Sequence, residues 1–264
     1  MVLDSAGDEW PWRYTDLQEL QVRVRANPSR GADVLALGHL LFHLRRLDAG
    51  RDLWRKAAEL GYQPAVAHRA LGMAAFTLDH DAETAIEHLA KAHQADPHDA
   101  IIARDLARAL FHKADQADSA ERRQAFWQRA CDVLQTAFEQ GKGRSDFVAL
   151  LARGLMRLGD PGRTARLLDS VRITIWEGAR EAHDLFEEAH LALGEEHLKA
   201  GRVAEALAEF NRALEYPANL ATGKLENARE AHIHYLRGNA LAALGRRAEA
   251  FAAWKLAADE PPSG

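Results

Sequence analysis

The sequence predicts an all-α fold, an α-solenoid of about six stacked helical hairpins preceded by an N-terminal helix. Three observations support this prediction. A pattern of small and bulky residues recurs along the chain, and no segment is rich in strand-forming residues. Ala makes up about one residue in five, whereas Pro occurs only 8 times in 264 residues. Because Ala costs least in a helix and Pro costs most, the composition favours helix throughout the chain.

The N-terminal helix is expected to begin at Thr15, since Thr15 and Gln18 have the spacing of a capping box. Residues 1–10 come before it and are expected to form a flexible tail. Residues 11–264 are expected to form a single solenoid domain, because stacked hairpins bury one continuous core.

Four copies of the repeat are clear. Each copy places Gly or Ala where two antiparallel helices approach closely, and a bulky side chain fills the space beside them. The copies run through Leu37, Gly38, Gly50, Trp54 and Ala57, then Leu71, Gly72, Ala85, Leu89 and Ala92, then Gly194, Gly201, Ala206, Phe210 and Ala213, and finally Gly238, Gly245, Ala250, Trp254 and Ala257. Each is expected to form one helical hairpin.

Two weaker copies lie between the clear ones. The first pairs a helix around Leu106 with a long helix over residues 119–140. The second pairs helices around Leu155 and Leu168 across a turn at residues 159–162, where Gly and Pro flank an Asp. They complete an array of about six hairpins.

Two segments, residues 171–178 and 216–225, interrupt the repeats. The first alternates β-branched residues, which suits an extended connector better than a helix. Tolerated surface insertions are enough to explain both segments. A binding role is the alternative, because loops of this length on a rigid scaffold commonly carry binding residues. The candidate binding residues in the loops are Trp176, Glu177, Tyr216, Asn219 and Lys224.

The repeat spacing resembles the tetratricopeptide repeat. A closer resemblance is to the tetratricopeptide region of bacterial proteins that begin with an uncharacterised, mutarotase-like β-sandwich domain. It is carried by Trp176-Glu177-Gly178, Tyr216-Pro217, Asn219-Leu220, Gly223-Lys224 and Tyr235. This resemblance implies a helical array that serves a carbohydrate-processing partner or domain. The sandwich itself is absent from this chain, so the resemblance assigns no sugar chemistry to it.

The first helix of each hairpin is expected to line a concave groove. Arginine forks bind carboxylates bidentately, and aromatic faces suit peptide side chains or sugar rings. The expected partner-binding groove consists of His39, Phe42, Arg69, Met73, Phe76, Arg104, Arg108, Phe111, Glu195, Tyr235 and Asn239. Two alternatives remain: a helix of the chain fills the groove, or the arginines pair with acids such as Asp105.

Catalytic motifs are absent from the sequence. It has no Gly-x-Ser-x-Gly elbow and no Walker loop, and its single cysteine, Cys131, is expected to be buried in a helix. We therefore expect no enzyme activity, catalytic residue or cofactor. His183, Glu187, His190 and His197 share one predicted helix and leave a metal site as an alternative to ordinary packing.

The net charge of −5 gives no reason to expect a nucleic acid or an anionic membrane as partner. No apolar run is long enough to span a membrane and no signal peptide is recognisable, so a cytoplasmic protein is expected. The leading hypothesis is a non-catalytic scaffold that binds a polypeptide through its groove, such as a carbohydrate-active β-sandwich protein. The alternatives are an accessory part of a carbohydrate-active assembly with a sugar-contacting loop, and a metalloenzyme on the helix around residues 183–197. Homo-oligomerisation remains open, because Phe251 and Trp254 lie on the last helix.

Overall fold

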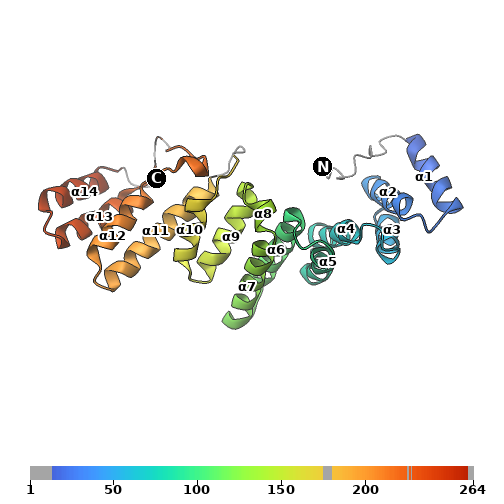
Figure 1. The fold of residues 1–264 in the computed structure, drawn as a ribbon, viewed down its shortest axis with the longest axis horizontal. Helices are drawn as coiled ribbons and strands as arrows, with labels where there is room; N and C mark the ends of the chain where they lie inside the picture. Colours follow the sequence, from blue (N-terminus) through green and yellow to red (C-terminus); the bar gives the residue numbers. More distant parts are fainter. Residues whose placement is uncertain (1–13, 175–179, 225, 227, 261–264) are drawn as a thin grey trace. The chain divides into compact units, whose positions relative to one another are not determined.

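The computed structural model describes residues 14–174, 180–224, 226 and 228–260, and this part of the chain contains fourteen α-helices and one 3-10 turn (Figure 1). The predicted all-α class is confirmed. The chain divides into two compact units, Met1–Ala117 (unit 1) and Asp118–Gly264 (unit 2). The prediction of one continuous domain over residues 11–264 stays a prediction. The tail at 1–10 and the loop residues Trp176 and Glu177 lie outside the described residues.

Unit 1 consists of an N-terminal helix, two helical hairpins and one further helix. Its helices are α1 (Tyr14–Ala26), α2 (Gly31–His43), α3 (Leu47–Glu59), α4 (Pro64–Thr77), α5 (Ala82–Ala95) and α6 (Ala100–Asp115). The α2–α3 and α4–α5 pairs form the hairpins, and α6 packs against α4 and α5. Helix α1 begins one residue before the predicted start, which places Thr15 inside its first turn. Leu17 and Leu20 on α1 are buried against α2, so α1 covers the open side of the first hairpin.

Unit 2 contains three hairpins. Its helices are α7 (Ala120–Thr136), α8 (Phe138–Gly141), α9 (Ser145–Arg157), α10 (Pro161–Ser170), α11 (Glu181–Lys199), α12 (Val203–Ala213), α13 (Ala231–Ala243) and α14 (Arg247–Asp259). Helices α9–α10, α11–α12 and α13–α14 pair in order, and α7 packs on α9. The predicted pairing of the helix around Leu106 with the helix after Ser119 stays a prediction, because α6 belongs to unit 1 and α7 to unit 2.

The glycines of the repeat pack where the sequence pattern places them. A Cβ atom at Gly38 would lie 2.8 Å from the Trp54 ring, and one at Gly72 would lie 2.6 Å from Leu89 Cγ. Real Cβ atoms essentially never approach other heavy atoms closer than 3.0 Å. The bulky residue of each second helix therefore occupies the space that the missing Cβ leaves, and the hairpin closes tightly because that position is Gly.

The long helix expected over residues 119–140 is instead two helices, α7 and α8. Ser119, expected as the first residue of the helix, instead caps α7, since its hydroxyl accepts a hydrogen bond from the Arg122 backbone N–H at 3.2 Å. The helix ends at Thr136, and the backbone then changes direction at Ala137. This change brings Gly141, at the end of α8, against the ring of Phe147, which leaves no space for a Cβ atom. Packing against α9 therefore interrupts what local sequence favours as one helix.

A histidine pair joins the two helices of the second hairpin. The Nδ1 atoms of His68 on α4 and His88 on α5 lie 3.2 Å apart, and the two rings are stacked. Burial is the largest cause that lowers the pKa of each imidazole below the ordinary value of 6.5. The positive charge of Lys91 lowers both pKa values further, and a charge on His68 lowers that of His88, whereas Glu87 raises both.

This pair predicts a loss of stability in mild acid. The pKa values of both histidines are lower in the folded chain than in the unfolded chain. As the pH falls through 6.5, the unfolded chain therefore binds more protons than the folded chain. The free energy of unfolding, which is highest above pH 6.5, decreases as a result. We expect the melting temperature of the wild-type chain to fall between about pH 7.5 and pH 5.5, and a His68→Gln/His88→Gln variant to show a smaller fall. Thermal unfolding followed by circular dichroism measures both. Equal falls in the two proteins would contradict a role for this pair.

Within the described residues, no helix is both long enough and apolar enough to cross a membrane.

Candidate interaction surface on helices α4 and α6

Two adjacent helices of unit 1 present most of the predicted groove residues. Each contributes three residues at spacings of four and three, which lie along one side of a helix. These six residues, which we call the α4–α6 surface, are Arg69, Met73 and Phe76 on α4 and Arg104, Arg108 and Phe111 on α6. The two helices are in contact, and Arg69 and Phe76 of α4 reach Asp105 and His112 of α6.

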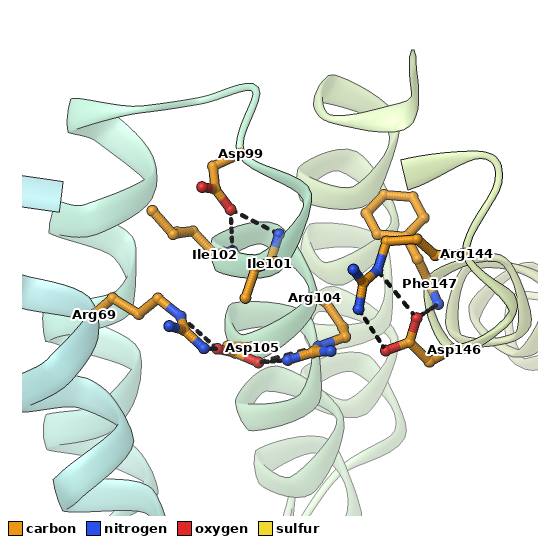
Figure 2. A network of polar contacts seen from close by, with 9 residues as sticks. All are labelled: Arg69, Asp99, Ile101, Ile102, Arg104, Asp105, Arg144, Asp146 and Phe147. Atoms are coloured by element: carbon orange, nitrogen blue, oxygen red, sulfur yellow. Dashed lines mark hydrogen bonds and ion pairs between the residues drawn. The ribbon is translucent and has the colours of Figure 1, made fainter. Parts of the chain in front are cut away.

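A buried carboxylate ties the two helices together. Figure 2 shows Asp105 of α6 between the guanidinium groups of Arg69 and Arg104. Arg69 donates from Nε and Nη2 to Asp105 Oδ2 at 2.8 and 2.7 Å. Arg104 donates from Nε and Nη2 to Oδ1 at 3.1 and 2.8 Å. The Asp105 side chain is 0% exposed, whereas each arginine side chain is 19% exposed. Each arginine therefore forms a two-pronged, charge-assisted contact and still reaches the surface.

The alternative that the arginines pair with Asp105 is thus realised by Arg69 and Arg104. Their two guanidinium groups share the one Asp105 carboxylate. Arg108 is exposed one turn further along α6 and adds a positive charge to the surface. Since Asp105 fixes both of its arginines, these two side chains lose little further entropy when a partner contacts them.

Apolar side chains lie next to this charge. Met73, Phe76 and Phe111 are each half-buried. The ring of Phe76 meets the imidazole of His112 edge to face, with centroids 5.6 Å apart. The α4–α6 surface therefore combines arginine guanidinium groups with partly exposed aromatic and thioether groups.

Phe42 on α2, which the sequence also assigns to the groove, makes contacts of another kind. The ring of Phe42 lies 4.6 Å from the Trp54 ring, and that of His39 lies 5.2 Å from it, measured between centroids. A Cβ atom at Gly50 would lie 2.9 Å from the Phe42 Cβ atom. Phe42 thus packs inside its own hairpin against α3.

The groove residues predicted in unit 2 are distributed over two hairpins. Glu195 on α11 is half-buried, and Tyr235 on α13 is exposed. Asn239 accepts a hydrogen bond at Oδ1 from Trp254 Nε1 at 3.1 Å, so its side chain supports the α13–α14 hairpin.

The two interruptions contact each other. The Asn219 side-chain amide donates to the backbone carbonyls of Leu168 and Val171, both at 2.8 Å, and its backbone carbonyl accepts from the Ile173 N–H at 3.0 Å. Residues 171–174 are extended, and Thr174 forms a parallel bridge with Arg144. Asn219 therefore holds the connector after α10 to the loop after α12.

The other two loop candidates converge on a carboxylate that the sequence pattern does not single out. Lys224 Nζ donates to Glu230 Oε2 at 2.6 Å, and the Tyr216 hydroxyl donates to Glu230 Oε1 at 3.3 Å. Burial first, and then the charge of Glu230, raises the pKa of Tyr216. The Tyr216 ring stacks on the His183 imidazole, with centroids 4.2 Å apart. Glu230 is the residue directly before α13, and the repeat pattern gives no signal that links it to either partner.

The histidines on α11 serve separate contacts. Nε2 of His183 donates to the Glu215 carbonyl at 3.0 Å, Nδ1 of His190 contacts Glu209 Oε2 at 2.6 Å, and Nδ1 of His197 accepts from Arg202 Nε at 2.8 Å. In the described part of the chain, no group of three or more His, Cys, Asp or Glu side chains is arranged to hold a metal ion. The geometry therefore gives no support to a metal centre on α11.

The single cysteine is buried, as predicted. Cys131 lies inside α7, and burial is the largest cause that raises its thiol pKa to about 11. At neutral pH such a thiol is protonated and a poor nucleophile.

Comparisons with known proteins find helical-repeat structures. No protein-family model matches the chain. It is similar to TTC0263, a thermophilic TPR protein of Thermus thermophilus, at 22% identity over 80% of this chain and 99% of that one, with a TM-score of 0.41. MamA is similar at 14% identity over 74% of this chain and 91% of that one, with a TM-score of 0.46. Human IFIT1, solved as a dimer with PPP-AAAA, is similar at 16% identity over 91% of this chain and 57% of IFIT1, with a TM-score of 0.44.

Proposed function

We propose that the chain is a protein-interaction scaffold and that its α4–α6 surface binds an extended polypeptide carrying carboxylate groups. The observation that carries this proposal is the exposed Arg108 beside the half-buried side chains of Phe76 and Phe111. A guanidinium group that reaches the surface can bind a carboxylate with two parallel hydrogen bonds.

The apolar part of the surface supports a peptide as the ligand. Met73, Phe76 and Phe111 are half-buried beside the arginines. A peptide in which acidic residues alternate with apolar ones would place a carboxylate at Arg108 and its apolar side chains on the Phe rings. Aromatic anchors beside arginines are the residue types that carry most binding energy at protein interfaces.

The decisive variant is Arg108→Glu, because Arg108 is exposed and lies outside the Asp105 cluster. We expect binding of acidic peptides to weaken by about tenfold or more, the effect of losing one hydrogen bond to a charged group. The measurement is fluorescence binding to a labelled peptide panel in which each acidic peptide has an Asn/Gln counterpart.

Arg129→Glu is the matched control, since Arg129 is an exposed arginine on α7, outside the α4–α6 surface. It should bind the panel like the wild type, and both variants should melt at the wild-type temperature. Equal binding by Arg108→Glu and wild type, or no preference for acidic peptides over their amide counterparts, would refute the proposal.

A further inference from the structure

The last two hairpins of unit 2 have the same internal packing. A Cβ atom at Gly194 on α11 would overlap the Phe210 ring of α12, and one at Gly238 on α13 would overlap the Trp254 ring of α14. The two pairs have equal separations along the chain, since 210 − 194 = 16 and 254 − 238 = 16. Residues of α12 and α14 that are 254 − 210 = 44 positions apart therefore occupy equivalent places in the two hairpins.

The equivalent residues differ in exposure. Leu207 on α12 is 6% exposed and belongs to the same core as Ile233 and Leu241 of α13. Its equivalent on α14 is Phe251, which is 71% exposed. Phe210 is fully buried, whereas its equivalent Trp254 is 37% exposed. The face that α13 covers on α12 is thus exposed on α14, with larger apolar side chains.

The exposed face follows one side of α14. Arg247, Phe251, Trp254 and Ala258 are spaced at four, three and four residues, and all four are exposed. We call these four residues the α14 face. The equivalent face of α12 packs against helix α13 within this unit. The α14 face is therefore suited to packing against another helix.

The charges at the two ends of α14 indicate which helix packs on the α14 face. Arg247 lies at the first residue of α14 and Asp259 at the last, and both side chains are exposed. Glu249 in the first turn pairs with Arg246, so Arg247 still adds a positive charge at the start of the helix. A basic residue at the start of a helix and an acidic one at its end both oppose the helix dipole. A second α14 packed antiparallel places an acidic end beside each basic end. The charge pattern that is unfavourable in one copy becomes complementary between two.

We propose that a second copy of this chain docks antiparallel on the α14 face and forms a two-fold symmetric dimer. Phe251 and Trp254 of both copies meet in the centre, and Arg247 of each copy lies beside the partner's Asp259. This surface belongs to unit 2, and its occupancy is independent of peptide binding on the α4–α6 surface.

The first test is the oligomeric state of the full chain, measured by sedimentation velocity over a concentration series. The wild type should be a dimer, and Phe251→Glu should be a monomer with an unchanged melting temperature, because the side chain contributes little to the core. Val22→Glu is the matched control, since Val22 is an apolar residue of α1 that is 61% exposed. It should remain dimeric.

The second test is a charge swap. Arg247→Asp and Asp259→Arg should each weaken dimerisation by roughly tenfold, since each variant replaces two symmetry-related ion pairs with like-charge contacts. The double variant should regain wild-type dimerisation. A wild type that stays monomeric at all concentrations, a Phe251→Glu variant that still dimerises, or a double swap that does not recover would each overturn the proposal.

Discussion

Asp105→Asn is expected to lower the free energy of unfolding by about 3 kcal/mol, the cost of removing one partner from a buried ion cluster. The amide keeps the volume of Asp105 but carries no charge, so the guanidinium groups of Arg69 and Arg104 lose their shared anion. Both arginines are mostly buried, and water replaces the carboxylate only in part. The loss is measured from the shift in the urea midpoint at constant m-value.

Asp146→Asn is the matched control for this variant. Asp146 also contacts an arginine, Arg144, at 3.3 Å, but its side chain is 33% exposed (Figure 2). An exposed pair of this kind contributes about 0–1 kcal/mol. Similar losses in the two variants would show that burial of Asp105 is not what makes its contacts strong.

Gly194→Ala is expected to lower the free energy of unfolding by about 2 kcal/mol, within the range for overpacking a core. Helix propensity alone predicts the opposite, since Ala in a helix interior is favoured over Gly by about 1 kcal/mol. The new Cβ would overlap the fully buried ring of Phe210, which has no exposed side toward which it can move. We therefore expect the packing effect to exceed the propensity gain, again measured by urea denaturation.

The control for this variant is Gly143→Ala, because a Cβ at Gly143 meets nothing within 4 Å. It should change the unfolding free energy by less than about 0.5 kcal/mol, as surface substitutions usually do. Adding Phe210→Leu to Gly194→Ala should recover part of the loss, since the shorter side chain leaves room for the methyl group. A Gly194→Ala protein that is more stable than the wild type would contradict this account of the repeat.

The fold class and the hairpin interiors can be predicted well from the sequence because both depend on local spacing. Gly38 and Trp54, or Gly194 and Phe210, are 16 residues apart, and one turn between two helices brings such residues together. Helix ends set by tertiary packing are harder to predict. The break between α7 and α8 depends on Phe147, which local propensity around Ala137 does not reveal.

The candidate surface can be predicted only in part. Periodicity places Arg69 and Arg104 on separate helices, which are α4 and α6 and are in contact, and Asp105 is among the acids within their reach. Which arginine contacts which carboxylate depends on side-chain geometry, which spacing does not specify. The convergence of Tyr216 and Lys224 on Glu230 lies in an irregular loop, where no period relates one residue to the next.

The contact between Asn219 and the connector after α10 has a consequence for cooperativity. In a stack of repeats each hairpin contacts its neighbours, and stability is close to a sum of nearest-neighbour terms. Asn219 instead bonds backbone groups 48 and 51 residues earlier in the chain, on the far side of the whole α11–α12 hairpin. The segments before and after the α11–α12 hairpin are therefore joined to each other through Asn219. If either segment frays, the same amide contacts must break. The α11–α12 hairpin and its two flanking segments should unfold as one unit, with the amide proton of Ile173 exchanging with solvent only when all three open together.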